Sequence, residues 1–433
     1  MVNNINQLLL QAQTANDAAD WSSLIQCLQQ LILGEDTRNP EIVKNREHLL
    51  ELALTILEQG DFHQRWDIAK VFTRLGNIVI PPLIEILEDA DAEEELRWYA
   101  ARILGELKNP ETIPPLVELL KTNDNEELKT IAATALGQIG TLAIDALTEL
   151  LADENTKLLA VRSLSQIRQK EIIPPLLIVV QDPEVTVRAA AIEALSSFHD
   201  KRVPPVLLNA LDDLAATVRR EAVLGLSFRP DLCSQLDLVT KLQPRLYDLN
   251  LEVAQAATVA LSRMGSDDAG EHLFKVLKSP HTPLKLQLEI IRALSWAGSV
   301  SSLEYLRQAL NQLQSLTLWQ EIVKVLGQVQ QPNLNALAVE ILLEMLLFKH
   351  PATDNATVKS AIALSLGQLG RTQAIEPLIK MLADQDSSVR LHAIAALKNL
   401  APEAAHQQLQ QLACETTLTP ELQQGITAAL AEW

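Results

Sequence analysis

Glycine, aromatic residues and cysteine are all scarce in this chain. Its 433 residues include 14 glycines, three cysteines and only 3% aromatic residues. Sheet-containing enzymes place aromatic and β-branched residues in their strands, whereas Leu, Ala, Glu and Gln, which favour helices, dominate here. A chain of this length would ordinarily fold as two or three globular domains. The composition therefore predicts an all-α fold.

The cysteines also lack the spacing of a disulfide framework or a metal site. Cys27, Cys233 and Cys414 are far apart, and none belongs to a Cys-x-x-Cys pair. Such usage is typical of a reducing compartment. The first residues contain no basic segment followed by a long apolar core, so no signal peptide is expected. The longest wholly apolar run, 172–180, is too short to span a bilayer. We expect a cytoplasmic protein with no membrane span.

Basic residues are fewer than acidic residues in this chain. There are 36 Lys and Arg residues against 55 Asp and Glu, which gives a formal net charge of −19. Duplex nucleic acid and anionic lipid are bound mainly through clusters of cations. This balance lowers the expectation of a nucleic-acid partner, although it permits a local basic patch.

The usual signatures of catalysis are absent from the sequence. It contains no glycine-rich phosphate loop, no His-Glu-x-x-His and no Gly-x-Ser-x-Gly, and its eight histidines show no ligand spacing. We therefore expect no catalytic residue, no metal and no cofactor. The three cysteines leave one alternative open, an accessory role in Fe–S cluster assembly, although a buried free cysteine is usually a small apolar side chain.

One short motif recurs along the chain. Ile-Pro-Pro-Leu stands at 80–83, 113–116 and 173–176, and Val-Pro-Pro-Val follows at 203–206. Proline suits the first turn of a helix, because the N–H that it lacks has no partner there. The residue before proline is disfavoured in the helical region, so we expect a break in the chain at that point. Each proline pair predicts the start of a helix.

A second helix is predicted after each of these. Basic residues 28 to 32 positions apart mark successive copies of one segment: Arg65, Arg97, Lys129, Lys157, Arg188 and Arg219. Apolar residues follow at helical spacing, as at Val187, Ala190 or Ala191, Leu195 and Phe198. Weaker copies are anchored at Ala254, Gln287, Trp319 and Gln423. A helix pair of this kind buries its apolar face only by stacking on its neighbours.

The pattern resembles HEAT repeats and, more narrowly, the short HEAT-like repeats of the phycobilisome lyase family. The proline at the start of the first helix, the Asp at the turn and the Val-Arg that opens the second helix carry this resemblance. It implies an α-α superhelix, a HEAT-like solenoid of about a dozen two-helix repeats over 61–433. Residues 1–60 do not match the repeat and are predicted to form an N-terminal helical cap that continues into the solenoid. Within them, 17–33 and 40–57 are amphipathic, and Asp17 or Asp20 is a candidate N-cap.

The resemblance further implies a ladder of charges between adjacent repeats. Its members here would be Asp153, Asp182 and Asp212 with Lys157, Arg188 and Arg219. These charges are expected to be structural. The repeats anchored at Ala254, Gln287 and Trp319 lack the cation and are expected to lose the ladder, so this region is interpreted as a hinge, a second contact surface or simple sequence drift.

Two enzyme activities occur on similar scaffolds. Deoxyhypusine hydroxylase binds di-iron through His-Glu pairs, and no such dipeptide occurs in this chain. Segment 97–105, Arg-Trp-Tyr-Ala-Ala-Arg-Ile-Leu-Gly, resembles a motif of E/F-type bilin lyases, but Arg102 and Ile103 replace a Trp pair. A flat tetrapyrrole needs broad apolar contact. A phycobilin lyase or bilin-binding chaperone therefore remains an alternative, and ordinary helix packing is another interpretation of Trp98 and Tyr99.

The variable positions of the second helices are the predicted contact surface. Positions one, five and nine after each anchor fall on one side of the helix, here called the stripe. By the resemblance, this side would line the concave face. Arg and aromatic residues are enriched in protein-binding hot spots. The stripe residues predicted to contact a partner are Trp66, Lys70, Arg74, Trp98, Arg102, Arg162, Arg220, Arg263, Arg292, Trp296 and Lys324.

The sequence thus predicts a non-catalytic scaffold or adaptor that binds another protein with an acidic or carboxylate-bearing surface. The family resemblance implies an assembly or chaperone role in a cyanobacterial or photosynthetic setting. The alternative interpretation of the stripe is that its cations are solvated and balance a neighbouring acidic face.

Overall fold

The computed structural model describes residues 2–34, 39–415 and 418–433. Within these ranges the chain forms α-helices and short 3-10 helices, and no strand. The prediction of an all-α fold is confirmed. The helices group into two compact units, an N-terminal unit of Met1–Val203 and a C-terminal unit of Pro204–Trp433.

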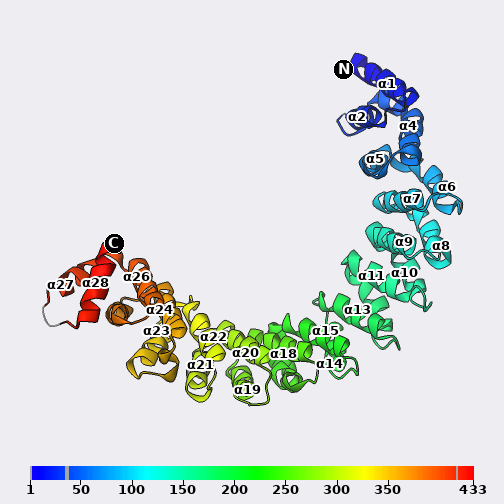
Figure 1. Ribbon diagram of the computed structural model, residues 1–433. Coiled ribbons are helices and arrows are strands. Elements are labelled where there is room, and N and C mark those ends of the chain that lie inside the picture. The colour runs from blue at the N-terminus through cyan, green and yellow to red at the C-terminus, as the bar shows by residue number, and fades with distance from the viewer. Residues whose placement is uncertain (1, 35–38, 416–417) are drawn as a thin grey trace. The chain divides into compact units, whose positions relative to one another are not determined.

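The N-terminal unit is built from helix pairs stacked in chain order (Figure 1). Four helices, α1 (Val2–Asp17), α2 (Trp21–Ile32), α3 (Pro40–Lys44) and α4 (Arg46–Gln59), precede the regular pairs. The first helices then form one layer: α6 (Ile80–Glu88), α8 (Ile113–Thr122), α10 (Ile144–Leu150) and α12 (Ile173–Ile178). The second helices form the other layer: α5 (Phe62–Leu75), α7 (Glu94–Glu106), α9 (Glu126–Ile139), α11 (Lys157–Ile167) and α13 (Val185–Ser196).

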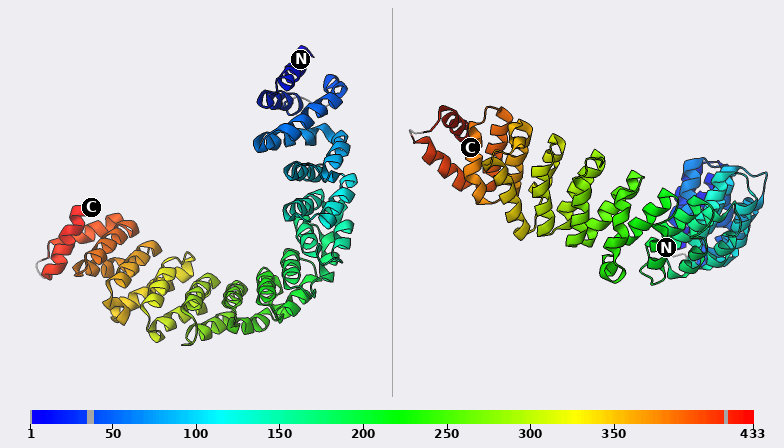
Figure 2. Two further views of the ribbon diagram at one scale, coloured as in Figure 1. Left: turned by 45° about the vertical axis from the view of Figure 1, so that its right-hand side comes forward. Right: turned by 90° about the horizontal axis from the view of Figure 1, so that it is seen from below.

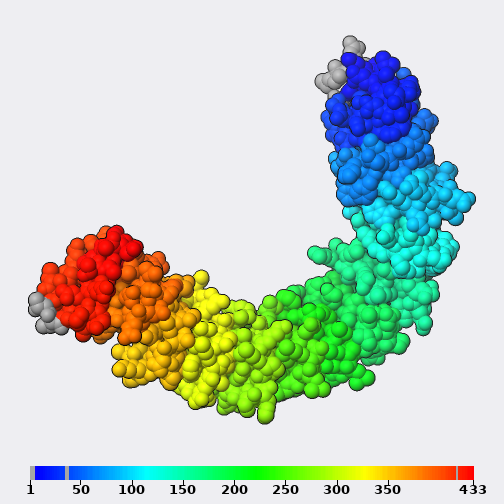
Figure 3. All heavy atoms as spheres, viewed as in Figure 1, coloured from blue at the N-terminus to red at the C-terminus, as the bar shows by residue number. Residues whose placement is uncertain are grey.

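The C-terminal unit has the same two layers (Figure 2). Its first-helix layer contains α14 (Val203–Ala210), α16 (Cys233–Leu236), α17 (Leu238–Leu242), α19 (Asp267–Leu277), α21 (Val300–Gln312), α23 (Pro332–Leu347), α25 (Ile375–Lys380) and α27 (Pro402–Ala413). Its second-helix layer contains α15 (Ala216–Ser227), α18 (Leu251–Met264), α20 (Leu284–Ala297), α22 (Leu316–Gly327), α24 (Ala356–Leu369) and α26 (Ser387–Leu400). The last helix, α28 (Pro420–Glu432), packs on α27 and on the 3-10 turn Met381–Ala383 that follows α25. In Figure 3 the surface of each unit is made by successive repeats in chain order.

The proline pairs start helices as predicted, but the chain does not break immediately before them. Helices α6, α8 and α12 begin with Ile-Pro-Pro, and the isoleucine that precedes the first proline is helical in each, as at Ile80 (φ −64°, ψ −52°). A 3-10 turn leads into each helix and supplies a hydrogen bond to that isoleucine's N–H. The break lies further upstream, where positive φ reverses the chain at Gly76, Lys108 and Arg168.

Apolar residues at helical spacing form the core between the two layers. In α13, the side chains of Val187, Ala191 and Leu195 are fully buried, while Phe198 is only half-buried. Neighbouring second helices also approach each other closely. A Cβ atom on Gly105 of α7 would lie 2.6 Å from Ala135 Cα of α9, and one on Gly367 of α24 would lie 2.8 Å from Ala396 Cα of α26. The Leu-Gly that ends many second helices therefore permits close helix contact.

A ladder of charges joins adjacent repeats, but its pairing differs from the prediction. Lys157 Nζ lies 3.0 Å from Asp182 Oδ2, and Arg219 pairs with Asp248. In each case the carboxylate belongs to the following repeat. Of the expected members, Asp212 pairs with Arg245 of the following repeat at 3.1 Å and not with Arg219. The basic residue is on a second helix and points forward, so the carboxylate that it reaches belongs to the next turn.

The arginine anchors also hold the turn of their own repeat through main-chain carbonyls. Arg188 Nη1 donates to the carbonyl of Asp182 at 2.8 Å, and Arg390 Nη1 donates to that of Asp384 at 2.7 Å. Neutral anchors keep a contact of this type: Gln287 Nε2 donates to Leu277 O at 3.0 Å, and Trp319 Nε1 donates to Leu310 O at 3.2 Å. These repeats lose the charge at the anchor and retain a bond to the preceding helix.

Local hydrogen bonds hold two segments that lie outside the regular repeat. Asp20 caps α2 by accepting a hydrogen bond from Ser23 N at 3.1 Å, as one of the two predicted N-caps. Helix α1, which the sequence did not predict, packs on α2. The long connection at 348–357, between α23 and α24, contains a 3-10 turn, Pro351–Asp354. His350 stabilises this turn by hydrogen bonds with Leu310 O and Ala352 N.

One segment of the described chain has the length and composition of a membrane span. It is Glu126–Leu150, and 56% of its most apolar 18-residue stretch is buried. The segment consists of α9, a 3-10 turn at Gly140 and α10, which are packed on neighbouring helices. A buried pair of core helices has the same apolar composition. This segment is therefore weak evidence for a membrane span.

Candidate functional site

The stripe lies on the surface of the second-helix layer. Its predicted contact residues belong to α5, α7 and α11 in the N-terminal unit and to α15, α18, α20 and α22 in the C-terminal unit. The side chains of Lys70, Arg74, Arg162, Arg263 and Lys324 are exposed, and Trp296 is 63% exposed. The apolar residues between them face the first helices, which leaves these positions for contact with another molecule.

Four stripe cations are neutralised within the protein. Lys70 pairs with Asp67 at 2.9 Å, and Arg102 pairs with Glu106 at 3.3 Å. Arg220 pairs with Glu221 at 2.8 Å, and Arg292 pairs with Glu321 at 2.5 Å and with Glu289 at 3.6 Å. A cation that already has a carboxylate neighbour attracts an acidic partner less strongly. These four residues are weaker candidates for charge recognition than the sequence indicated.

Three other stripe cations are available to a partner. Arg74, Arg162 and Lys324 are exposed and make no ion pair with any part of the chain that the structure describes. Arg263 is exposed and makes no ion pair with the described residues, but it has two uncharged partners. Its Nη1 donates to Ser227 Oγ at 3.0 Å, and its guanidinium lies 4.8 Å from the ring centroid of Phe228. The strongest positive sites of the stripe are therefore the three unpaired side chains.

Aromatic residues gather around Arg102 between α5 and α7. The guanidinium of Arg102 stacks on Trp66, 3.7 Å from the ring centroid, and lies 6.0 Å from that of Trp98. Phe62 stacks on Trp66 with an interplanar angle of 22°. Trp66 is 41% exposed. Arg102 is thus held by its own protein on two sides, by Trp66 and by Glu106.

The segment that resembles the bilin lyase motif is used for packing. Tyr99 is fully buried, and its hydroxyl donates to Phe62 O at 3.0 Å. Burial, with the nearby carboxylate of Glu95, raises the pKa of this phenol. Gly105 lies against Ala135 of the next helix. These contacts agree with the interpretation of Tyr99 as a helix-packing residue.

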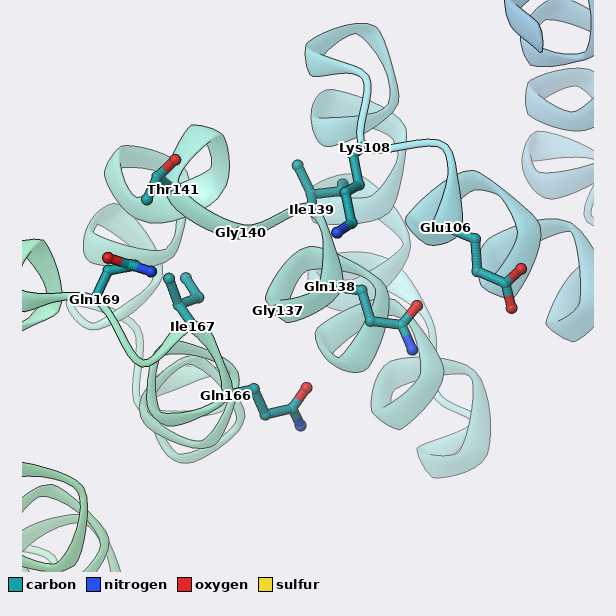
Figure 4. A pocket seen from close by; sticks show the side chains of 10 residues that line it. All are labelled: Glu106, Lys108, Gly137, Gln138, Ile139, Gly140, Thr141, Gln166, Ile167 and Gln169. Carbon is teal, nitrogen blue, oxygen red and sulfur yellow. The ribbon is translucent and has the colours of Figure 1, made fainter. Parts of the chain in front are cut away.

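A cavity lies where α7, α9 and α11 end. It has a volume of about 590 Å³ (Figure 4). Its lining residues are Glu106, Lys108, Gly137, Gln138, Ile139, Gly140, Thr141, Gln166, Ile167 and Gln169. Positive φ at Lys108, Gly140 and Arg168 turns the chain away from each helix end and opens this space. No sequence motif marks this cavity, although three glutamines line it.

The described residues contain no cluster of three or more His, Cys, Asp or Glu side chains suited to a metal ion. Cys27 and Cys233 are half-buried, and Cys414 is exposed. Burial, aided by Asp20, raises the pKa of the Cys27 thiol, and burial also raises that of Cys233. A raised pKa disfavours the thiolate that binds metal. Among the described residues, the three cysteines do not belong to any shared site for a cluster.

Comparison with known proteins identifies the repeat. A family model described as HEAT repeats matches residues 80–158, 144–227 and 343–431, which together exceed half of the chain. The chain belongs to the HEAT-repeat family. The prediction of HEAT repeats is confirmed, while the narrower assignment to the phycobilisome lyase group is not. No curated protein sequence matches this HEAT-repeat chain.

Solved structures with a similar fold include karyopherins. Kap95p, in a structure described by its effect on the switch loops of RanGDP, is 15% identical over the whole of this chain and 66% of its own, with a TM-score of 0.53. Kap121p, bound to the extreme C-terminus of the phosphatase Cdc14p, is 15% identical over 98% of this chain and 58% of its own, with a TM-score of 0.51. The HEAT-repeat chain therefore spans about two thirds or less of these neighbours. At this identity the likeness shows a shared helical solenoid fold.

Proposed function

We propose that this HEAT-repeat protein is a non-catalytic scaffold that binds another protein along the second-helix layer. The observation that carries the proposal is the set of exposed, unpaired cations on the stripe of that layer: Arg74, Arg162 and Lys324. Guanidinium and ammonium groups that lack an internal carboxylate favour a partner surface with Asp, Glu or a terminal carboxylate. Karyopherins with a similar fold are bound to proteins in their solved structures, which supports this use of the scaffold.

The finer setting follows from the sequence resemblance alone. We propose an assembly or chaperone role in the cytoplasm of a cyanobacterial or photosynthetic cell. The phycobilin lyase alternative gains nothing from Tyr99 and Arg102, because both side chains are engaged within the protein. Co-expression with a phycobiliprotein subunit and a bilin separates the two functions. Covalent transfer of colour would support the lyase, and capture of the subunit without such transfer would support the scaffold.

Charge reversal tests the contact surface directly. We expect Arg162→Glu combined with Lys324→Glu to remove the proteins that the wild-type chain captures from native cells, as measured by affinity purification with quantitative mass spectrometry. The matched control is Lys121→Glu, which makes the same change at an exposed position of the first-helix layer. Undiminished capture by the double variant would contradict the proposed surface.

A further inference from the structure

The cavity at the ends of α7, α9 and α11 presents side-chain amides to solvent. Gln138 and Gln166 occupy the last stripe position of consecutive second helices, and Gln169 lies beside them. All three side chains are exposed, and none makes a hydrogen bond with the part of the chain that the structure describes. Glu106, the corresponding residue of α7, is instead paired with Arg102. The cavity therefore contains carboxamides that are free to bind a ligand.

Glycines in the preceding helices make room for these amides. A Cβ atom on Gly137 would lie 2.8 Å from Gln166 Oε1, and one on Gly105 would lie 3.1 Å from Gln138 Oε1. In Figure 4, Gly137 lies between the side chains of Gln138 and Gln166. Each glutamine thus extends over the helix before it. Repetition of the same glycine-amide arrangement places the two carboxamides in equivalent positions one repeat apart.

The amide chemistry restricts the class of ligand. A carboxamide donates and accepts hydrogen bonds at once and carries no charge. Its complement is a site that offers a donor and an acceptor on the same side, as the N–H and C=O of one residue of an extended chain do. Packed helices lie about 8–10 Å apart, and an extended chain advances about 3.3 Å per residue. Two carboxamides on adjacent helices therefore match peptide groups about three residues apart.

Other ligands that use amides fit this cavity less well. Sugars and nucleobases stack on aromatic rings, and none of the described lining residues is aromatic. Phosphate-rich ligands need several cations, whereas Lys108 is the one basic residue among those lining residues. The same register carries Gln328, Gln368 and Asn399 in the C-terminal unit, each with an exposed side chain. Carboxamides therefore recur at this position in both units, whereas Arg74, Glu106, Phe228, Arg263 and Trp296 occupy it in other repeats.

We propose that this cavity binds an extended segment of a partner polypeptide through its main chain, with Gln138 and Gln166 pairing with peptide groups about three residues apart. The inference rests on the proposed function, because it assumes that the partner is a protein. It adds that the partner contributes an unfolded stretch of chain. Arg162, one helical turn before Gln166 on α11, then lies where it can meet an acidic side chain of that segment.

The test uses the full-length protein and a random library of 12-residue peptides. A peptide enriched on the wild-type chain is labelled, and its Kd is measured by fluorescence anisotropy. We expect Gln138→Ala and Gln166→Ala each to weaken binding about fivefold, which is the effect of one hydrogen bond of about 1 kcal/mol. Gln26→Ala, which removes an exposed carboxamide from α2 in the same unit, is the control and should leave Kd unchanged.

Modification of the peptide distinguishes main-chain from side-chain recognition. N-methylation at two positions about three residues apart should weaken binding by a similar factor, and that effect should disappear in the Gln138→Ala/Gln166→Ala variant. Failure to enrich any peptide, equal binding by the double variant, or insensitivity to N-methylation would each overturn the inference. The capture experiment with Arg162→Glu and Lys324→Glu tests the proposed function separately. Loss of capture by that variant would still support binding of a folded partner surface, even if the peptide experiments failed.

Discussion

Arg219 of α15 forms a two-point ion pair with Asp248 of the following repeat. Arg219 Nε lies 2.8 Å from Asp248 Oδ2, and Nη2 lies 2.8 Å from Oδ1. The remaining Nη1 donates to the carbonyls of Asp213 and Leu214. The Asp248 side chain is only 5% exposed. One guanidinium therefore ties the turn of its own repeat to the turn of the next.

We expect Arg219→Ala to lower the free energy of unfolding of the C-terminal unit by about 2–3 kcal/mol, because it leaves Asp248 buried without its counter-charge. Arg219→Lys should recover part of the loss, since an ammonium group cannot form both bonds. Urea denaturation, with hydrogen exchange of residues 245–250, measures the effect. Arg202→Ala is the matched control, because the Arg202–Asp200 pair has similar two-point geometry but is exposed and local. Equal destabilisation by both variants would contradict the cross-repeat role.

The same carboxylate predicts the response to acid. Burial raises the pKa of Asp248, but hydrogen bonds from Arg219 and from Asn250 N–H outweigh it, and the net pKa is lowered. A native pKa below the unfolded value of about 3.9 stabilises the fold above that pH and ceases to do so as pH falls through the native pKa. The stability difference between wild type and Asp248→Asn should therefore shrink between pH 5 and the acid limit. Denaturant midpoints across this range provide the measurement, and a constant difference would argue against it.

Because second helices pack closely, we expect replacement of certain helical glycines by alanine to destabilise the fold, although alanine has the higher helix propensity. Replacing a helical glycine by alanine normally stabilises by up to about 1 kcal/mol. At Gly105 the added Cβ would meet Ala135 Cα at 2.6 Å, so we expect Gly105→Ala to destabilise by about 1–3 kcal/mol. At Gly270 the nearest atoms belong to the side chains of Tyr305 and Ser302, at 3.3 Å or more. Gly270→Ala should be neutral or stabilising in thermal unfolding, and a similar loss at both sites would refute the packing argument.

Stacking of Arg102 on Trp66 should appear as an energetic coupling. A double-mutant cycle of Trp66→Ala and Arg102→Ala is expected to give a coupling of about 1 kcal/mol in the free energy of unfolding, typical of a partly desolvated cation–π contact. Arg74, exposed on the same helix as Trp66, supplies the comparison through a cycle of Trp66→Ala with Arg74→Ala. Coupling of equal size in the two cycles would show that the stacked geometry contributes nothing specific.

Helix starts and the core face were predictable because they depend on local chemistry. Proline at a first turn and apolar residues at helical spacing act within a few residues, so Pro81 and Pro114 lie in first turns and Val187 is buried, as the sequence predicted. The ladder pairing was not predictable in the same way. A spacing of about 30 residues puts an Asp both before and after every basic anchor, and only the direction of the side chain decides between them.

The position of the stripe on the second helices was predictable, but the internal pairing of its cations was not. Spacing placed Arg102 and Arg292 on the stripe, yet their internal partners, Trp66 and Glu321, lie one repeat away and emerge only from packing. The amides of Gln138 and Gln166 carry no sequence motif of their own. A signal was nonetheless present, because each follows a small residue at the same register of its repeat.

The forward direction of the ladder gives the repeat array a head and a tail. A repeat with a basic anchor contributes a cation to the repeat that follows it. Its own turn contributes a carboxylate to the repeat before it. Lys157 and Asp182 show one such pair, between two adjacent repeats. A copy of such a repeat inserted beside the original would find both of its partners already in place. Arrays of this kind can lengthen or shorten by whole repeats without orphaning a charge, whereas insertion next to an anchor such as Gln287 would leave a carboxylate unmatched.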